Sequence, residues 1–375
     1  MPILQLRNHI PISGPARREP VDGTETALRV SLGFEPAWYH LRCGVDLGER
    51  WHKDPRDRHD TLVVMKAELH RAFPMVSYWN PDDPRDTWTM SGVYGAYVIP
   101  QVFGCTLGYA ADRWPVVVHR PAHSLEKWAA LDSDELLAGP FVAELFGQMD
   151  IIEAEGGMIH GYLVWHSVIN NAFNIVGPDI FLALTDAPET AHRFFALTPA
   201  PTCGVRRCGV CDVVIRLAQR VQERQRRSGF AIDQLDISNC VMNMISWRAY
   251  RQFFFPYDRR CAESFERFGV HTCNWNVTPY VHELTKLPKV GYLDMGMMSD
   301  MRLVRQLFPE TRCAVMYSPV KFHDAPIEEI RADMLRIYDE LTPCDVVMTD
   351  IQAQTPDERV IALLEICRAL EDGLI

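Results

Sequence analysis

The sequence contains no stretch of about 18 or more uninterrupted apolar residues, the length that a membrane-spanning helix needs. Its N-terminus, MPILQLRNHIPISGPARREP, lacks the basic, apolar and small-residue order of a signal peptide. No long basic run occurs and the formal net charge is −11, whereas nucleic acid is bound through positive charge. We therefore expect a cytoplasmic protein with no membrane and no nucleic-acid partner.

Several catalytic motifs are also absent. No G-x-G-x-x-G joins a strand to a helix, and neither a P-loop nor a G-x-S-x-G elbow occurs. The sequence thus gives no support for nucleotide phosphate or serine hydrolase chemistry. Its 11 cysteines are an odd number in a long chain without a secretion signal, which is typical of reduced thiols.

From about residue 93 onward, short apolar runs alternate with amphipathic stretches, as in repeated strand–helix units around a parallel sheet. Helix starts carry capping and proline signals, as in Asp324-Ala-Pro and Thr355-Pro-Asp-Glu358. The pattern predicts a single (β/α)8 TIM barrel over residues 41–375 and an N-terminal arm over residues 1–40, irregular as far as residue 35. Strands are predicted at 94–102, 158–165, 231–238, 270–275, 291–295, 314–318 and 345–350, with an eighth before 93 or between 100 and 155.

Catalytic groups in such a barrel lie at the C-terminal ends of the strands. The predicted strands end where apolar sequence gives way to polar or aromatic residues. An ordinary strand-to-loop transition gives the same pattern at any one position, so the set is more informative than its members. The predicted substrate contacts are His166, Asp236, Asn239, Asn274, Asp294 and Tyr317. Asp236 and Asn239, together with Ser238, have an equally good interpretation as caps of the helix that follows.

The pair His271 and Cys273 suggests a metal site. Residues i and i+2 of a strand point to the same face, so the imidazole and the thiol can meet at one point. Nitrogen and sulfur ligands suit zinc, and a catalytic zinc needs a third protein ligand from elsewhere. The alternative is a coincidental histidine and cysteine in a buried strand.

A second cysteine pattern, Cys203-Gly-Val-Arg-Arg-Cys208-Gly-Val-Cys211, matches three ligands of a plant-type iron–sulfur site. A fourth cysteine would be needed, for which Cys240 is the candidate. The simpler interpretation, which we prefer, is a cysteine-rich connection between two helices that holds no cluster.

Three segments resemble the uroporphyrinogen decarboxylase superfamily over about residues 90–372, and more weakly over 35–90. The segment ISWRAYRQFFFPYDRRCAESFERFGVHTCNWN is similar to the pattern I-S-P-E-x-Y-x-x-F-x-x-P-Y … H-x-C-G-N. The segment HSVINNAFNIVGPDIFLALTDAPETAHRFF resembles N-x-A … G-x-E … L-x-x-D-P-E-x-V-H. The end, DVVMTDIQAQTPDERVIALLEICRAL, resembles the last strand and the T-P-E-N helix. The resemblance implies a TIM barrel, in agreement with the strand pattern.

Within this superfamily the H-x-C motif is similar to that of the corrinoid-linked methyltransferases, in which a His, a Cys and a later Cys bind zinc. The resemblance implies that His271 and Cys273 are ligands. The position of the later cysteine falls at about residues 349–350, where this chain has no cysteine. We expect Asp350 to be the third ligand, because a carboxylate is an acceptable zinc ligand. Cys344 lies six residues earlier, ~20 Å away at the other end of the strand.

The resemblance implies a catalytic site of His271, Cys273 and Asp350 around Zn²⁺. It implies a metal-dependent methyltransferase that moves a methyl group between a small O-, N- or S-methyl compound, or a thiol, and a corrinoid carried by a partner protein. The alternatives are a decarboxylase-like lyase without cofactor and a catalytically silent small-molecule-binding barrel. The decarboxylase branch has the motif P-x-W-x-M-R-Q-A-G-R, but residues 36–44 here hold the single arginine Arg42, displaced by one position. Binding a polycarboxylate without a positive floor would be costly.

Overall fold

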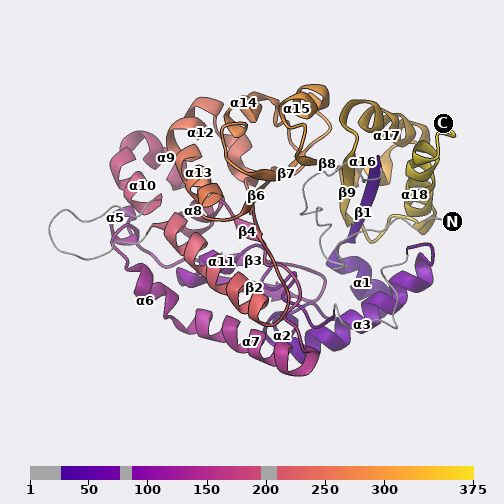
Figure 1. Cartoon of the computed structure of the whole chain (residues 1–375). Helices are drawn as coiled ribbons and strands as arrows, with labels where there is room; N and C mark the ends of the chain where they lie inside the picture. The colour runs from indigo at the N-terminus through magenta and orange to yellow at the C-terminus, as the bar shows by residue number, and fades with distance from the viewer. Residues whose placement is uncertain (1–26, 77–86, 196–208) are drawn as a thin grey trace.

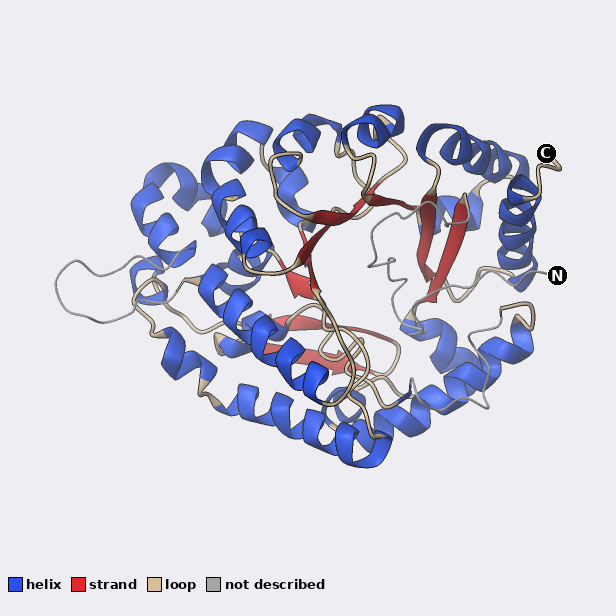
Figure 2. Cartoon of the chain, in the orientation of Figure 1, coloured by secondary structure: helices blue, strands red, loops and turns tan. Residues whose placement is uncertain are grey.

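The computed structural model of the chain describes residues 27–76, 87–195 and 209–375. Their strands form a parallel seven-stranded sheet in the order β1-β9-β8-β7-β6-β5-β4, and a separate antiparallel hairpin, β2-β3. The sheet curls, and the helices lie on its outer side (Figures 1 and 2). The strands are β1 Leu28–Phe34, β2 Thr106–Ala110, β3 Arg113–His119, β4 Trp165–His166, β5 Gln234–Ser238, β6 Arg267–His271, β7 Val290–Met295, β8 Arg312–Met316 and β9 Cys344–Ile351.

The helices follow the strands along the chain and cover the sheet (Figure 1). Those before β5 are α1 Pro36–Cys43, α2 Glu49–Lys53, α3 Pro55–Ala72, α4 Val98–Val102, α5 Leu125–Trp128, α6 Ser133–Leu137, α7 Pro140–Gly156, α8 Val168–Val176, α9 Asp179–Asp186, α10 Pro188–Phe195 and α11 Val210–Arg227. Those after β5 are η3 Cys240–Met244, α12 Trp247–Phe253, α13 Phe255–Glu263, η4 Thr278–Tyr280, α14 Val281–Leu284, α15 Met301–Leu307, α16 Pro319–Asp324, α17 Ile327–Leu341 and α18 Asp357–Glu371.

No single helix in the described part of the chain is long and apolar enough to cross a membrane. The helices α8 and α9 meet that criterion only when they are taken together, and the chain bends by 109° between them.

The second half of the chain follows the predicted strand–helix order closely. β5, β7, β8 and β9 overlap the strands predicted there, and α17 begins just after Asp324-Ala-Pro. The prediction at 94–102 is wrong, since this stretch forms turns and α4. Tyr94 and the glycines Gly92 and Gly95 all have positive φ angles, which are incompatible with an extended strand. In the predicted strand 158–165, only Trp165 belongs to β4, although His160 forms an isolated parallel bridge with Thr89.

Part of the stretch up to residue 35, which was predicted to be irregular, has regular structure. Residues 28–34 form β1, which pairs in parallel with β9, and α1 follows from residue 36. The strand β1 thus lies before residue 93, one of the two places where an eighth strand was expected. It also lies within the stretch that was predicted to be irregular. Residues 1–26 of the predicted arm lie outside the described residues.

The strand β1 carries a charged residue, Arg29, and this charge is neutralised inside the protein. The carboxylate of Asp345 on β9 accepts hydrogen bonds from Nη2 of Arg29 at 2.7 Å and from Nε of Arg312 at 2.9 Å. All three residues are buried, and the two guanidinium groups lower the pKa of Asp345 despite the opposing effect of burial. This charged group thus joins β1, β9 and β8 at adjacent positions of the sheet.

A substitution of Asp345 tests this arrangement. Asp345→Ala would leave two guanidinium groups buried without their counterion, and breaking a buried pair in this way costs about 3–5 kcal/mol of unfolding free energy. We expect a loss of that size in urea denaturation followed by circular dichroism. The control is Asp112→Ala, which removes the partner of Arg113 from an exposed pair and should change stability by less than about 1 kcal/mol. Equal effects of the two substitutions would contradict the assignment.

Candidate metal centre

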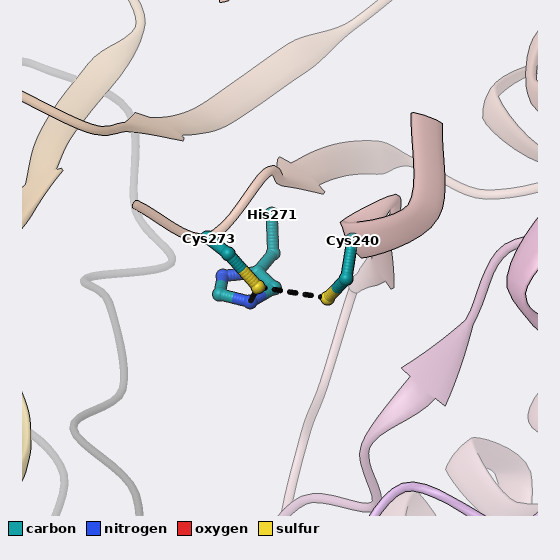
Figure 3. A group of neighbouring side chains, drawn as sticks. All are labelled: Cys240, His271 and Cys273. Carbon is teal, nitrogen blue, oxygen red and sulfur yellow. Dashed lines mark hydrogen bonds between the residues drawn. The ribbon is translucent and has the colours of Figure 1, made fainter. Parts of the chain in front are cut away.

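Three potential metal ligands lie together at the C-terminal ends of two adjacent strands. Cys240 begins η3 just after β5, His271 ends β6, and Cys273 follows two residues later (Figure 3). Ser238 and His271 are paired positions in the parallel ladder of β5 and β6. Because Cys240 and Cys273 each lie two residues beyond these paired positions, the register brings the two cysteines to the same place.

The side chains of Cys240, His271 and Cys273 are in direct contact. Nε2 of His271 lies 3.1 Å from Sγ of Cys273, which lies 2.9 Å from Sγ of Cys240. All three potential ligand atoms lie within 4.8 Å of one another, and all three residues are partly exposed. In the part of the chain that the structure describes, this is the one group of three or more His, Cys, Asp or Glu side chains that meets these distances.

Cys273 reaches this position by a turn and not by strand alternation. β6 ends at His271, and Cys273 has a φ of 59°, in the left-handed region that non-glycine residues rarely occupy. The prediction that the imidazole and the thiol meet at one point is confirmed, but the expectation that both lie on one strand is wrong. Backbone strain of this kind is frequent at functional sites.

Asp294, which was predicted to contact substrate, instead supports His271 from behind. Its Oδ2 lies 2.5 Å from Nδ1 of His271, and its Oδ1 accepts a hydrogen bond of 2.6 Å from the backbone N–H of Thr272. The hydroxyl of Tyr292 donates a further bond to Oδ2 at 2.8 Å. Burial favours the neutral imidazole, but the negative charge of Asp294, with contributions from Cys273 and Cys240, raises the pKa of His271. Asp294 therefore orients the ring with Nε2 toward the two sulfur atoms.

The two cysteines are joined by a hydrogen bond, which shifts their pKa values in opposite directions. The hydrogen bond that Cys273 donates to Cys240 lowers the pKa of Cys240 and raises that of Cys273, and the nearby His271 favours the thiolate form of both. Cys240 is therefore the more acidic thiol of the pair, and it lies beside a histidine whose pKa is raised.

One nitrogen and two sulfur donors form a ligand set that suits zinc. Ligand atoms on a tetrahedral zinc with bonds of ~2.0–2.3 Å lie roughly 3.3–3.8 Å apart, so contacts of 2.9 and 3.1 Å need only a small outward movement of the side chains. A histidine whose other nitrogen is held by a carboxylate is also the usual arrangement of a metal ligand. The three side chains thus fit a zinc ion with a fourth place left for a small molecule.

Asp350, which was expected to be the third ligand, does not belong to this group, and Cys240 lies in it instead. The carboxylate of Asp350 accepts a hydrogen bond of 3.1 Å from Nε1 of Trp114, on the hairpin strand β3. β9 is three strands away from β6 in the sheet, or roughly 14 Å along it, whereas Cys240 comes from the neighbouring strand β5. Burial raises the pKa of Asp350, and the bond from Trp114 opposes this effect.

His166, which was predicted to contact substrate, ends β4 and lies close enough to Cys240 and His271 to feel their charge. Asn174 can donate to it, since its Nδ2 lies 3.0 Å from Nδ1 of His166, which leaves the proton of the neutral ring on Nε2. Burial lowers the pKa of His166 to about 4, with a smaller opposing effect of Cys240 and a further lowering by His271. Tyr97 packs edge-on against the ring at 5.9 Å. His166 is therefore a neutral hydrogen-bond donor at this end of the sheet.

Two other predicted contacts make hydrogen bonds within the fold. Asn239 is fully buried and donates its side-chain N–H to Asp258. Tyr317 is buried and donates its hydroxyl to Asp333 on α17, in the outer layer of helices. Their polarity therefore reflects hydrogen bonding within the fold.

Asp236 and Asn274 remain predicted substrate contacts. Asp236 is partly exposed on β5 and accepts a bond of 2.5 Å from Gln234. A Cβ atom on Gly269 of β6 would lie 1.7 Å from Oδ1 of Asp236, so a glycine is required there. Asn274 is exposed in the loop after Cys273.

Sequence reasoning considered Cys240 only as the fourth ligand of an iron–sulfur cluster. The available signal was its place just after a predicted strand that precedes the H-x-C strand. Cys211, from the same pattern, is buried at the start of α11 with its sulfur 3.8 Å from that of Cys261. Cys203 and Cys208 lie outside the described residues.

No protein-family model and no curated protein matches the sequence. Among solved structures, a methyltransferase from Methanosarcina mazei matches with a TM-score of 0.60 and 15% sequence identity, covering 96% of this chain and 95% of that chain. A B12-independent methionine synthase from Shewanella sp. W3-18-1, in complex with selenomethionine, has a TM-score of 0.41 and 11% identity, with 85% and 88% coverage. Over nearly its whole length, the chain therefore shares the fold of the Methanosarcina mazei methyltransferase.

Proposed function

We propose that this chain is a zinc-dependent methyltransferase that moves a methyl group between a small methylated compound, or a thiol, and a corrinoid carried by a partner protein. The observation that carries the proposal is the contact of Cys240, His271 and Cys273 in front of the carboxylate of Asp294. This ligand set matches zinc, and the sequence motifs resemble the corrinoid-linked branch of the superfamily. The fold shared with a methyltransferase agrees with the proposal.

The protein's part in this chemistry is to hold three donors and to leave one place open. Asp294 fixes the orientation of His271, and the register of β5 and β6 places Cys240 beside Cys273. Bound zinc would supply Lewis acidity, which keeps a substrate thiol in its nucleophilic thiolate form. His166 presents its Nε2–H at the same end of the sheet, where it can donate a hydrogen bond to substrate.

A centre with Cys240 as its third ligand favours a different substrate from a centre with Asp350 as its third ligand. Two thiolate ligands donate more charge than one thiolate and one carboxylate, so the zinc becomes a weaker Lewis acid. A weak Lewis acid suits holding a reactive thiolate better than activating an ether or an amine. We therefore propose a thiol as the methyl acceptor, with methyl transfer from the corrinoid to the thiol.

A decarboxylase-like function has less support, because arginines that might bind a polycarboxylate already have carboxylate partners. Arg29 and Arg312 are paired with Asp345, and Arg42 is paired with Asp357. A substrate with several carboxylates would have to compete with these ion pairs.

The first test is zinc content together with methyl transfer. We expect about one zinc per chain by mass spectrometry, and methyl transfer from methylcobalamin to 2-mercaptoethanol, followed by the loss of methylcobalamin absorbance. His271→Ala, Cys273→Ser and Cys240→Ser should each lose the zinc and lower the rate by more than about 100-fold, the upper range for an outer-shell partner. The control, Cys43→Ser, changes a partly exposed cysteine outside the centre and should have no effect. Wild-type protein without zinc would refute the proposal.

The second test concerns Asp294. Asp294→Asn should weaken zinc binding by roughly 10- to 100-fold, because His271 loses the negative charge that orients it. The amide oxygen can still accept the bond from Thr272, so the fold should persist. The measurement is competition for zinc with a chromophoric chelator, with Tyr292→Phe as a milder control that removes one bond to the same carboxylate. An unchanged zinc affinity in Asp294→Asn would contradict the assigned role.

A further inference from the structure

The turn that carries Cys240 is held from both sides. Before it, the backbone N–H of Asn239 donates to the carbonyl of His271 at 2.7 Å, which ties the ends of β5 and β6 together. After it, the hydroxyl of Tyr280 donates to the carbonyls of Met242 at 3.1 Å and Ile245 at 2.5 Å. Both flanking segments of Cys240 are thus anchored, and its sulfur accepts a hydrogen bond from Cys273 at 2.9 Å.

The side chain of Asn239 leads from this turn to a buried acid. Its Nδ2 donates a hydrogen bond of 2.9 Å to Oδ2 of Asp258, in the first turn of α13. The same oxygen accepts a bond of 2.8 Å from the hydroxyl of Tyr250 on α12. All three residues have at most 1% of their surface exposed. One carboxylate oxygen therefore joins the Cys240 turn to two helices of the outer layer.

Asp258 is an expensive residue for this position. Both donors are neutral side chains, and burying a carboxylate without a counterion costs free energy. Burial raises the pKa of Asp258 to about 7, although the bonds from Asn239 and Tyr250 oppose this effect. The helix N-terminus lowers the cost of the charge only in part. An apolar residue would stabilise the core at lower cost, but it could not hold Asn239.

We propose that Asp258 is a positioning residue, which through Asn239 holds the sulfur of Cys240 at its place in the metal centre. This inference rests on the proposed function, because it assumes that Cys240 is a ligand. Without Asp258, the Asn239 side chain loses its partner and the turn can rotate, so that Cys240 no longer meets Cys273 and His271. Metal bound to such a variant would keep one thiolate ligand in place of two.

The test uses cobalt(II) as a probe in the full-length, zinc-depleted protein. The near-ultraviolet charge-transfer band of bound cobalt grows with the number of thiolate ligands, so it reports on Cys240 directly. Asp258→Ala should weaken cobalt binding by roughly 10- to 100-fold and reduce the band toward that of Cys240→Ser. Asp258→Asn should restore both, because an amide oxygen can accept the bonds from Asn239 and Tyr250.

The matched control is Tyr257→Phe, on the same helix. Its hydroxyl lies 2.7 Å from Nδ1 of His192, and it should leave both the cobalt affinity and the band unchanged. If Asp258→Ala acted by loosening α13 in general, Tyr257→Phe and Asp258→Asn should also lower the cobalt affinity and the band. If it acts by loss of the bond to Asn239, these two variants should keep both. If Asp258→Ala does not fold, Tyr250→Phe takes its place as the test of the positioning role. This variant removes one bond to Asp258 and should weaken cobalt binding a few-fold.

The outcomes separate this inference from the proposed function. Wild-type protein that binds neither zinc nor cobalt refutes the metal-dependent function and this inference with it. Wild-type protein that binds cobalt through two thiolates, together with folded Asp258→Ala or Tyr250→Phe of the same affinity and spectrum, refutes the positioning role alone.

Discussion

The hydrogen-bonded register of three neighbouring parallel strands is the constraint on which the metal centre depends. The ladder pairs Ser238 with His271, and the next ladder pairs Val270 with Leu293. The next residues of these two strands, His271 and Asp294, therefore lie side by side. Cys240 and Cys273 each follow two residues after the pair Ser238 and His271. A slip of one residue between β5 and β6 would turn every side chain of the shifted strand to the other face of the sheet.

Three buried carboxylates, two in the sheet and one on α13, are compensated in different ways. Asp345 has two arginines, Asp294 has a histidine with a raised pKa, and Asp258 has only neutral donors. The first arrangement joins strands, while the other two surround the candidate metal ligands. The cost of a buried carboxylate without a counterion is greatest for Asp258, which is why its link to Cys240 points to a role in the site.

The likeness to the Methanosarcina mazei methyltransferase concerns the fold, since only 15% of the residues are identical. Function resides in the site, and many different reactions use similar barrels. The chemistry of the site therefore depends on which donor atoms the strand ends present. Two sulfurs and one nitrogen, with a carboxylate behind the histidine, form a donor set that suits zinc.

The sequence alone determined the local structure of the second half of the chain. Apolar runs between capped helices predicted β5, β7, β8 and β9, because burial on both faces requires continuous apolar sequence. The H-x-C motif predicted the meeting of His271 and Cys273, because residues two apart remain neighbours in either a strand or a tight turn. The sequence did not predict β1. A buried strand is not expected to contain an arginine, and the partner of Arg29, Asp345, lies far away in the sequence.

Only the tertiary structure decided the third member of the centre. Asp350 and Cys240 both follow strands, and nothing in their spacing from His271 separates them. The order of the strands separates the two candidates, because β5 pairs with β6, whereas β9 lies three strands away from β6. The roles of Asn239, Tyr317 and Asp294 were decided in the same way, by partners 16 to 23 residues distant that no local pattern reveals. Contacts between strands and helices far apart in sequence depend on packing, and for that reason the chain specifies the site only once it has folded.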